Sequence, residues 1–155
     1  IWSRCCGCSR RPTREGLYVV DKELVRRRLA QLDEYLGILR RSSSYSYEEF
    51  IGDPERYGSA ERFLQLSIEL VTDIGNHVVS DEGLGEVATY ADVPRRLAAA
   101  GKIDADLADG WARMIGFRNV LVHEYLEIDR REVHRNLTES LDDFEALKRA
   151  FAALL

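Results

Sequence analysis

The repeated three-four spacing of apolar residues is the strongest constraint on how this chain folds. Such spacing places one apolar stripe along a helix, and it recurs in four long segments. No segment alternates apolar and polar residues as a half-buried strand does, and no internal repeat is visible. We therefore expect an all-α fold. In the first segment the stripe consists of Val25, Leu29, Leu32, Leu36 and Leu39.

Capping residues set the boundaries of the predicted helices. Asp53 is followed by Pro54, a pair that favours the N-cap and the first helical position. Gly75 is expected to mark a close helix crossing. The segments 42–47 and 81–87 are predicted to be loops, and the helices are predicted at 21–41, 53–79, 92–101, 104–123 and 129–155. Together they predict an antiparallel four-helix bundle with one additional short helix.

Length and composition indicate one globular domain. The chain has 155 residues, 45% of them hydrophobic and 32% charged, which is enough to build a core. No apolar run approaches the ~18–20 residues of a membrane span, and nothing resembles a secretory signal. We therefore expect a cytoplasmic protein with no membrane contact.

The first sixteen residues differ from the rest of the chain. Residues 1–16 contain all three cysteines and four arginines. A structural zinc site would need a fourth ligand, and none is apparent. We expect a disordered or artefactual leader, followed by one helical domain at 17–155. Without this leader the chain keeps 18 of its 22 basic and 26 of its 27 acidic residues, a net charge of −8.

An acidic chain is not expected to coat nucleic acid nonspecifically, so RNA would have to bind a local basic patch. One group of basic residues surrounds the segment 118–125, and several acids dilute it. The basic residues are Arg113, Arg118, Arg130, Arg131, Arg135, His123 and His134, and the acids are Glu124, Glu127, Asp129 and Glu132.

Residues 118–125 bring an arginine, an amide, an imidazole and a phenol into an otherwise apolar helical segment. On a helical wheel Arg118 falls on the apolar stripe, next to Trp111. A guanidinium at such a position is costly unless it is paired. We therefore expect Arg118 either to line a crevice or to form a salt bridge inside the fold, with Glu69 and Asp73 as the candidate acids.

Asn119 and His123 form a second stripe, roughly 100–140° away from Arg118. The tips of Arg118 and His123 therefore diverge on one helix. A site that uses both is completed most simply by a second copy of the segment at the two-fold axis of a homodimer. Gly116, one layer away, leaves room for a close partner.

These residue types suit metal-independent cleavage of RNA, in which the ribose 2′-OH attacks the adjacent phosphorus. The reaction needs no metal, cofactor or protein nucleophile. His123 would transfer protons near neutral pH, and Arg118 would hold the phosphate as its charge builds. Asn119 would orient the imidazole or contact a phosphate oxygen. The structural alternative makes Arg118 an internal ion pair and His123 an ordinary helix-end histidine.

The pattern Arg-x4-His-x-Tyr, with an asparagine after the arginine, resembles the signature of the HEPN superfamily. The string FRNVLVHEYLEID and the upstream segment DPERYGSAERFLQLSIELVTDIGNHVV are similar to HepT-type toxins, and the similarity covers residues 24–155. This resemblance implies a homodimeric HEPN-like fold and an endoribonuclease toxin, with tRNA and mRNA as candidate substrates. It implies the roles above for Arg118, Asn119 and His123, with both protomers contributing to one cleft.

The resemblance also implies a role for Tyr125. It would accept AMP groups from a partner MNT-type nucleotidyltransferase antitoxin, and the added negative charge would occupy the place of the substrate phosphate. Alternatively, the Tyr125 ring closes the core at the end of the helix. The competing function for the whole chain is a noncatalytic helical subunit that binds nucleotide or regulates a nucleotidyltransferase.

Asp73 and His77 are candidate supporting residues, because they lie one turn apart on one helix face. A purely structural pair is the alternative. The three histidines His77, His123 and His134 lack the spacing of known metal-binding motifs. No metal site is therefore predicted.

Overall fold

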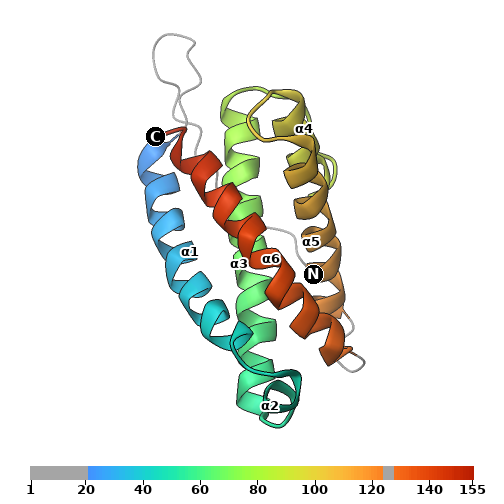
Figure 1. The fold of residues 1–155 in the computed structure, drawn as a ribbon. Coiled ribbons are helices and arrows are strands. Elements are labelled where there is room, and N and C mark those ends of the chain that lie inside the picture. The colour runs from blue at the N-terminus through green and yellow to red at the C-terminus, as the bar shows by residue number, and fades with distance from the viewer. Residues whose placement is uncertain (1–20, 124–127) are drawn as a thin grey trace.

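The computed structural model describes residues 21–123 and 128–155, and these residues form six helices. The helices are α1 (Lys22–Ser43), α2 (Tyr47–Ile51), α3 (Pro54–Asp81), α4 (Asp92–Ala99), α5 (Ala105–His123) and α6 (Arg130–Ala152). The four long helices run alternately down and up the molecule (Figure 1). The predicted all-α antiparallel bundle is confirmed. Within the described part of the chain, no helix is both long and apolar enough to cross a membrane. The expected leader, 1–16, lies outside the described residues.

The long helices begin where their aspartates predict. The side chains of Asp21, Asp53, Asp104 and Asp129 each accept a hydrogen bond from a backbone N–H two or three residues later, at 2.7–3.1 Å. These bonds satisfy donors that the first turn of a helix leaves without partners. The short helix differs slightly, because Asp92 is its first residue rather than its cap.

Helix α2 is not predicted from the sequence, in which residues 42–47 are expected to form a loop. In the structure α1 continues to Ser43, and α2 begins after a capping box formed by Ser46 and Glu49. The Ser46 Oγ accepts from the Glu49 N–H at 3.3 Å, and the Glu49 carboxylate accepts from the Ser46 N–H at 2.9 Å. Phe50, fully buried, anchors the turn in the core. Five residues are too few to show a periodic apolar stripe.

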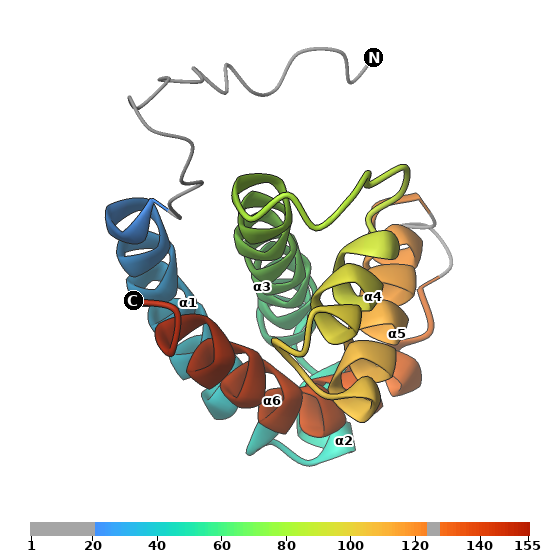
Figure 2. The same cartoon turned by 90° about the horizontal axis from the view of Figure 1, so that it is seen from above.

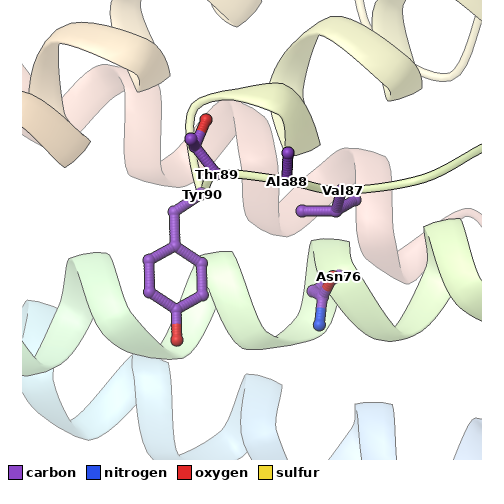
Figure 3. A pocket seen from close by; sticks show the side chains of 5 residues that line it. All are labelled: Asn76, Val87, Ala88, Thr89 and Tyr90. Carbon is purple, nitrogen blue, oxygen red and sulfur yellow. The ribbon is translucent and has the colours of Figure 1, made fainter. Parts of the chain in front are cut away.

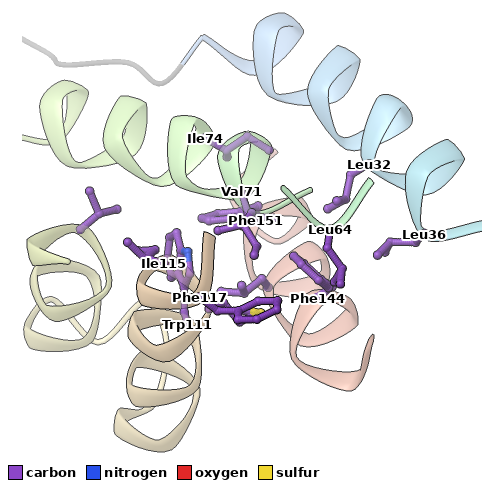
Figure 4. Packing of buried hydrophobic residues seen from close by; sticks show 14 of the residues in the cluster. Leu32, Leu36, Leu64, Val71, Ile74, Trp111, Ile115, Phe117, Phe144 and Phe151 are labelled. Atoms are coloured by element: carbon purple, nitrogen blue, oxygen red, sulfur yellow. The ribbon is translucent and has the colours of Figure 1, made fainter. Parts of the chain in front are cut away.

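Helix α3 is the centre of the bundle. It packs against α1 on one side and against α5 and α4 on the other, while α6 covers a third side (Figure 2). The core lies between these helices (Figure 4). Its largest fully buried side chains include Trp111, Phe50, Phe144 and Phe151.

The contact between α3 and α5 is fixed by Trp111. Its indole Nε1 donates to the Thr72 Oγ1 of α3 at 3.3 Å, and the Thr72 hydroxyl donates in turn to the Ile68 carbonyl at 2.7 Å. A Cβ on Gly75 would lie only 2.4 Å from the Trp111 Cη2. The predicted close crossing at Gly75 is therefore confirmed, and it sets the position of the helix that carries the Arg-x4-His motif.

Candidate functional site

The three predicted catalytic residues lie in the last two turns of α5. Phe117 and Leu121, which alternate with them, are buried in the core and fix the rotation of the helix. This rotation leaves Asn119 and His123 exposed on one face, one turn apart, and Arg118 half-buried. The two stripes expected from the helical wheel are therefore present in the fold.

Arg118 forms an ion pair with Glu69 of α3. Its Nη2 and Nε donate to Glu69 Oε1 at 2.6 and 3.0 Å, and Gln65 Nε2 donates to the same oxygen at 3.0 Å. The Arg118 and Glu69 side chains are 20% and 33% exposed, so water screens the pair only in part. Of the two acids expected for Arg118, the structure assigns Glu69.

The ion pair orients Arg118 without using all of its donors. Glu69 accepts from one side of the guanidinium, while Nη1 points towards the Asn119 side-chain oxygen at the longer distance of 3.4 Å. A guanidinium has five N–H donors in a fixed plane, so donors remain for a phosphate oxygen next to Asn119. An arginine held in this way is preorganised for an anion.

His123 is the last residue of α5 and is exposed. It is five positions after Arg118, which corresponds to a rise of roughly 7.5 Å and a rotation of about 140° along the helix. Among residues 21–123 and 128–155, no hydrogen bond or ion pair joins the two side chains. Within one protomer the guanidinium and the imidazole therefore diverge, as expected. Tyr125, the expected AMP acceptor, lies outside the described residues.

Asp73 and His77 take separate partners. Asp73 accepts from Arg28 of α1 at 2.8 Å. His77 Nε2 lies 3.0 Å from an Asp81 oxygen, which is ion-pair distance, and it has no hydrogen-bond partner among the described residues. His77 is eight residues, about 12 Å, beyond Glu69 along α3. Because α3 and α5 are antiparallel (Figure 1), this direction leads away from His123, so the fold does not bring His77 to the end of α5.

A row of polar side chains runs along α3 at four-residue spacing. We call it the α3 polar row, and it consists of Tyr57, Glu61, Gln65, Glu69 and Asp73. Arginines from three other helices meet it: Arg130 of α6, Arg118 of α5 and Arg28 of α1. Two acids of this row, Glu69 and Asp73, are expected from the sequence, but the row itself is not, although its regular four-residue spacing is the signal that reveals it.

Burial shifts the pKa of two carboxyl groups near the motif. Burial raises the pKa of Glu61, and the nearby Arg130, 3.9 Å away, opposes this change. Burial likewise raises the pKa of Asp143 on α6, where Arg113 of α5 has the opposing effect. Arg113 therefore faces an acid rather than adding to an open basic patch.

The described residues offer no obvious place for a metal ion. Across 21–123 and 128–155, no three histidine, cysteine, aspartate or glutamate side chains gather in a way that could hold one. His77, His123 and His134 belong to α3, α5 and α6, and the His134 Nε2 is 3.0 Å from the Tyr45 carbonyl oxygen.

A shallow pocket of about 220 Å³ lies elsewhere, between α3 and the loop that precedes α4 (Figure 3). Asn76 of α3 lines it, seven residues or about 10 Å beyond Glu69 on the side away from His123. The other lining residues are Val87, Ala88, Thr89 and Tyr90. None of these side chains transfers protons near neutral pH, so the pocket is separate from the motif and lacks its chemistry.

Solved structures with the same fold include toxin–antitoxin complexes. A HEPN toxin from Shewanella oneidensis, tri-AMPylated and in complex with an MNT antitoxin, matches with a TM-score of 0.78 and 25% identity over 85% of this chain and 98% of that one. A toxin–antitoxin structure with AMP-PNP has a TM-score of 0.79 at 24% identity, covering 85% and 99% of the two chains. The cytosolic protein YutE from Bacillus subtilis, 20% identical over 88% and 91%, has a TM-score of 0.76 and shares the fold. The bundle is thus of the HEPN type, as the motif indicates.

Sequence comparisons narrow this class. The family model for HepT-like ribonucleases matches residues 32–151. The tRNA nuclease HepT of Aphanizomenon flos-aquae is 27% identical over 125 residues, which cover 81% of this chain and 85% of that protein. The mRNA nuclease HepT of Shewanella oneidensis is 34% identical over 82 residues, 53% of this chain and 62% of that protein. The chain therefore belongs to the HepT-like ribonuclease family, and the expected enzyme class, a ribonuclease, is confirmed.

Proposed function

We propose that this protein is the toxin of a toxin–antitoxin pair, a metal-independent endoribonuclease with a composite site at a homodimer interface. The observation that carries the proposal is the end of α5, where Glu69 orients Arg118 beside Asn119 and His123 is exposed. Membership of the HepT-like ribonuclease family supports RNA as the substrate class. The names of two relatives make tRNA and mRNA the candidate substrates.

In the proposed reaction the ribose 2′-oxygen forms a bond to the adjacent phosphorus while the bond from phosphorus to the 5′-oxygen breaks. The products are a 2′,3′-cyclic phosphate and a 5′-hydroxyl. One imidazole accepts the proton of the 2′-OH, and a protonated imidazole supplies one to the leaving 5′-oxygen. A single His123 can perform both steps, because the imidazole that accepts the first proton can then donate it as the imidazolium. Arg118 stabilises the charge that builds on the phosphate oxygens, and Asn119 hydrogen-bonds to an oxygen or to the imidazole.

The exposed face of α5 is the proposed dimer surface. Gly116, Asn119 and His123 are all exposed there, and a Cβ added to Gly116 would meet no atom within 4 Å. A two-fold axis on this face would bring the same residues of a second copy opposite the first. Arg118 and His123 diverge within one protomer, but in such a dimer Arg118 of one protomer can share a site with His123 of the other.

We further propose that an MNT-type nucleotidyltransferase antitoxin neutralises the enzyme by attaching AMP to Tyr125. Tyr125 follows His123 by two residues, and the related Shewanella toxin is AMPylated in complex with an MNT antitoxin. A phosphodiester at this position would carry negative charge and bulk towards Arg118. It would compete with the substrate phosphate for the same guanidinium.

The noncatalytic alternative is favoured by one observation, the ion pair of Arg118 with Glu69, which a purely structural arginine would also form. An exposed imidazole and an exposed amide one turn apart are not needed for that role. Both functions predict a folded helical protein, so only an assay of RNA cleavage separates them.

The deciding experiment incubates the unmodified protein with cellular RNA in EDTA and maps the ends of the fragments. We expect cyclic-phosphate ends from the wild type and none from His123→Ala. Because the His123 side chain is exposed, its removal should leave the fold intact. Absence of cleavage by a well-folded, unmodified wild type would favour the regulatory subunit. Mass spectrometry of Tyr125 after co-expression with the antitoxin tests the modification, and no mass gain in units of AMP counts against it.

Mixing two inactive variants tests the composite site. Arg118→Ala and His123→Ala protomers are mixed after unfolding and refolding together. If Arg118 and His123 of each site come from different protomers, half of the dimers regain one of two sites, and about a quarter of the wild-type activity returns. No recovery, with mixed dimers present by mass spectrometry, contradicts this arrangement.

A further inference from the structure

Three arginine–tyrosine stacks lie at the end of the bundle that carries α2. The guanidinium carbons are 4.0, 4.2 and 5.1 Å from the ring centroids, which is stacking distance. We call this group the tyrosine–arginine platform. It consists of Arg56 on Tyr45, Arg130 on Tyr57 and Arg131 on Tyr47.

The rings of the platform are held from below. Tyr45 follows α1, Tyr47 begins α2 and Tyr57 lies in the first turn of α3. His134 of α6 contacts the Tyr45 carbonyl oxygen at 3.0 Å, and its ring packs edge-on against the buried Phe50 at 5.2 Å. The tyrosines are half-buried, whereas Arg130 and Arg131 are exposed. The platform therefore places two exposed guanidinium groups, those of Arg130 and Arg131, over half-buried rings.

Arg130 lies farther from its acid than Arg56 does from Asp53. The Arg130 Nε is 3.9 Å from the Glu61 carboxylate, and its side chain is 44% exposed. Arg56, in contrast, pairs with Asp53 at 3.4 Å and donates to a backbone carbonyl at 3.0 Å. Stacking uses the faces of a guanidinium, so one face and the N–H edge of Arg130 stay available to a ligand.

The platform lies beside the catalytic end of α5. Arg130 sits over Tyr57 and faces Glu61, and the α3 polar row leads from there to Glu69 and Arg118, about 12 Å from Glu61. Along α5, His123 lies about 7.5 Å from Arg118, in the direction that leads back to the level of Glu61. His123 and Glu61, the acid that Arg130 faces, therefore differ in level along the bundle by only about 5 Å. Figure 1 shows α2 and the starts of α3 and α6 at the same end as the end of α5.

We propose that the tyrosine–arginine platform binds unpaired RNA next to the cleaved phosphate, with bases stacking on the exposed guanidinium faces. The inference rests on the proposed function, because it extends the RNA surface from the same site. Proteins read single-stranded RNA by stacking bases on aromatic rings and guanidinium planes. Stacking needs no large positive field, which fits a chain of net charge −5. Paired bases cannot offer their faces, so the substrate class is a single-stranded segment or a loop.

The test measures binding to a short single-stranded RNA and to an abasic RNA of the same length by fluorescence anisotropy. His123→Ala protein serves as the background, so that the RNA is not cut. Arg130→Lys keeps the charge but removes the stacking plane. We expect it to bind the RNA about tenfold more weakly, the loss of one modest stack, and to bind the abasic RNA unchanged. Arg135→Lys, on the same helix but paired with Glu132 at 3.8 Å, is the matched control and should bind both as before.

Each other outcome points elsewhere. Equal weakening on both RNAs, or no weakening on either, overturns the stacking proposal. Unchanged RNA binding with weaker binding of the nucleotidyltransferase would make the platform a protein-docking surface instead. With His123 restored, Arg130→Lys should cut a dinucleotide as the wild type does and a longer RNA with a higher KM. If the wild type cuts no RNA while the anisotropy difference persists, the cleavage proposal fails and the platform stands.

Discussion

The contact between Gly75 and Trp111 gives a quantitative test of how α3 positions the motif helix. In Gly75→Ala the new methyl would lie 2.4 Å from the Trp111 Cη2 and 2.7 Å from the Val93 Cγ1. Both neighbours are fully buried, so neither can swing into solvent. The variant must push α3 away from α5 and α4, or rotate the indole off its hydrogen bond to Thr72.

The expected loss of stability is the difference between two free-energy contributions. Overpacking of this severity costs about 3 kcal/mol, the upper part of its usual range. Replacing a glycine by alanine inside a helix returns about 1 kcal/mol. The net destabilisation is about 2 kcal/mol, or a fall in Tm of about 4–8 °C for a chain of this size. Gly58→Ala is the matched control on the same helix, because its Cβ meets nothing within 4 Å. It should raise Tm by about 2–4 °C.

The assay is thermal and urea unfolding of the three proteins at one fixed concentration, since association would shift the apparent stability. RNA cleavage is measured on the same samples well below the transition. Because Trp111 lies two turns before Arg118 on α5, a folded Gly75→Ala protein should also cleave more slowly, as expected when catalytic groups shift by a fraction of an ångström. A Gly75→Ala protein as stable as Gly58→Ala would refute the close-packing argument.

Three further tests, which use four variants, have defined outcomes. Thr72→Val removes the acceptor of the buried Trp111 N–H and should lower the free energy of unfolding by about 1–3 kcal/mol. Its control, Ser67→Ala, removes a buried hydroxyl with no partner among the described residues and should be nearly neutral. Urea titrations compare the stability of the two variants. Gly116→Leu has room within the protomer and should fold stably but elute as an inactive monomer in size exclusion with light scattering; an active dimer would exclude the proposed face. Burial raises the pKa of Asp143 above its ordinary 3.8, so its ionisation disfavours the folded state and the stability it contributes is lost as pH rises through the folded pKa. The stability of Asp143→Asn relative to wild type should therefore grow from below pH 3.8 towards neutrality, and a difference that is flat with pH would contradict this.

The sequence predicts the long helices well because their signals are local. The aspartate caps, the Asp53-Pro54 pair and the three-four stripes each act within one or two turns, and the structure confirms them. The phases of Arg118 and His123 on α5 also follow from the local register, since burial of Phe117 fixes the rotation of the helix. Helix α2 is not predicted because no long apolar stripe follows its Ser46–Glu49 capping box.

Long-range partners were harder to predict. Asp73 and His77 share a helix face, yet Asp73 meets Arg28 of another helix and His77 meets Asp81. A helical wheel shows which side chains share a face but not which neighbouring helix brings an arginine to it. For the same reason Glu69 could be named as one of two acids for Arg118 but not chosen. The proposed second half of the site would come from another copy of the chain, which neither a helical wheel nor a single protomer describes.

The α3 polar row has a consequence for how this helix tolerates change. Its acids Glu61, Glu69 and Asp73 meet arginines of α6, α5 and α1 respectively, and all depend on one helical register. Replacing any one of them loosens one neighbour. Inserting or deleting a single residue just before Glu61 would turn all three by about 100° and shift them along the axis, detaching three helices at once. Family members should therefore differ in the residue types of this helix far more than in its length.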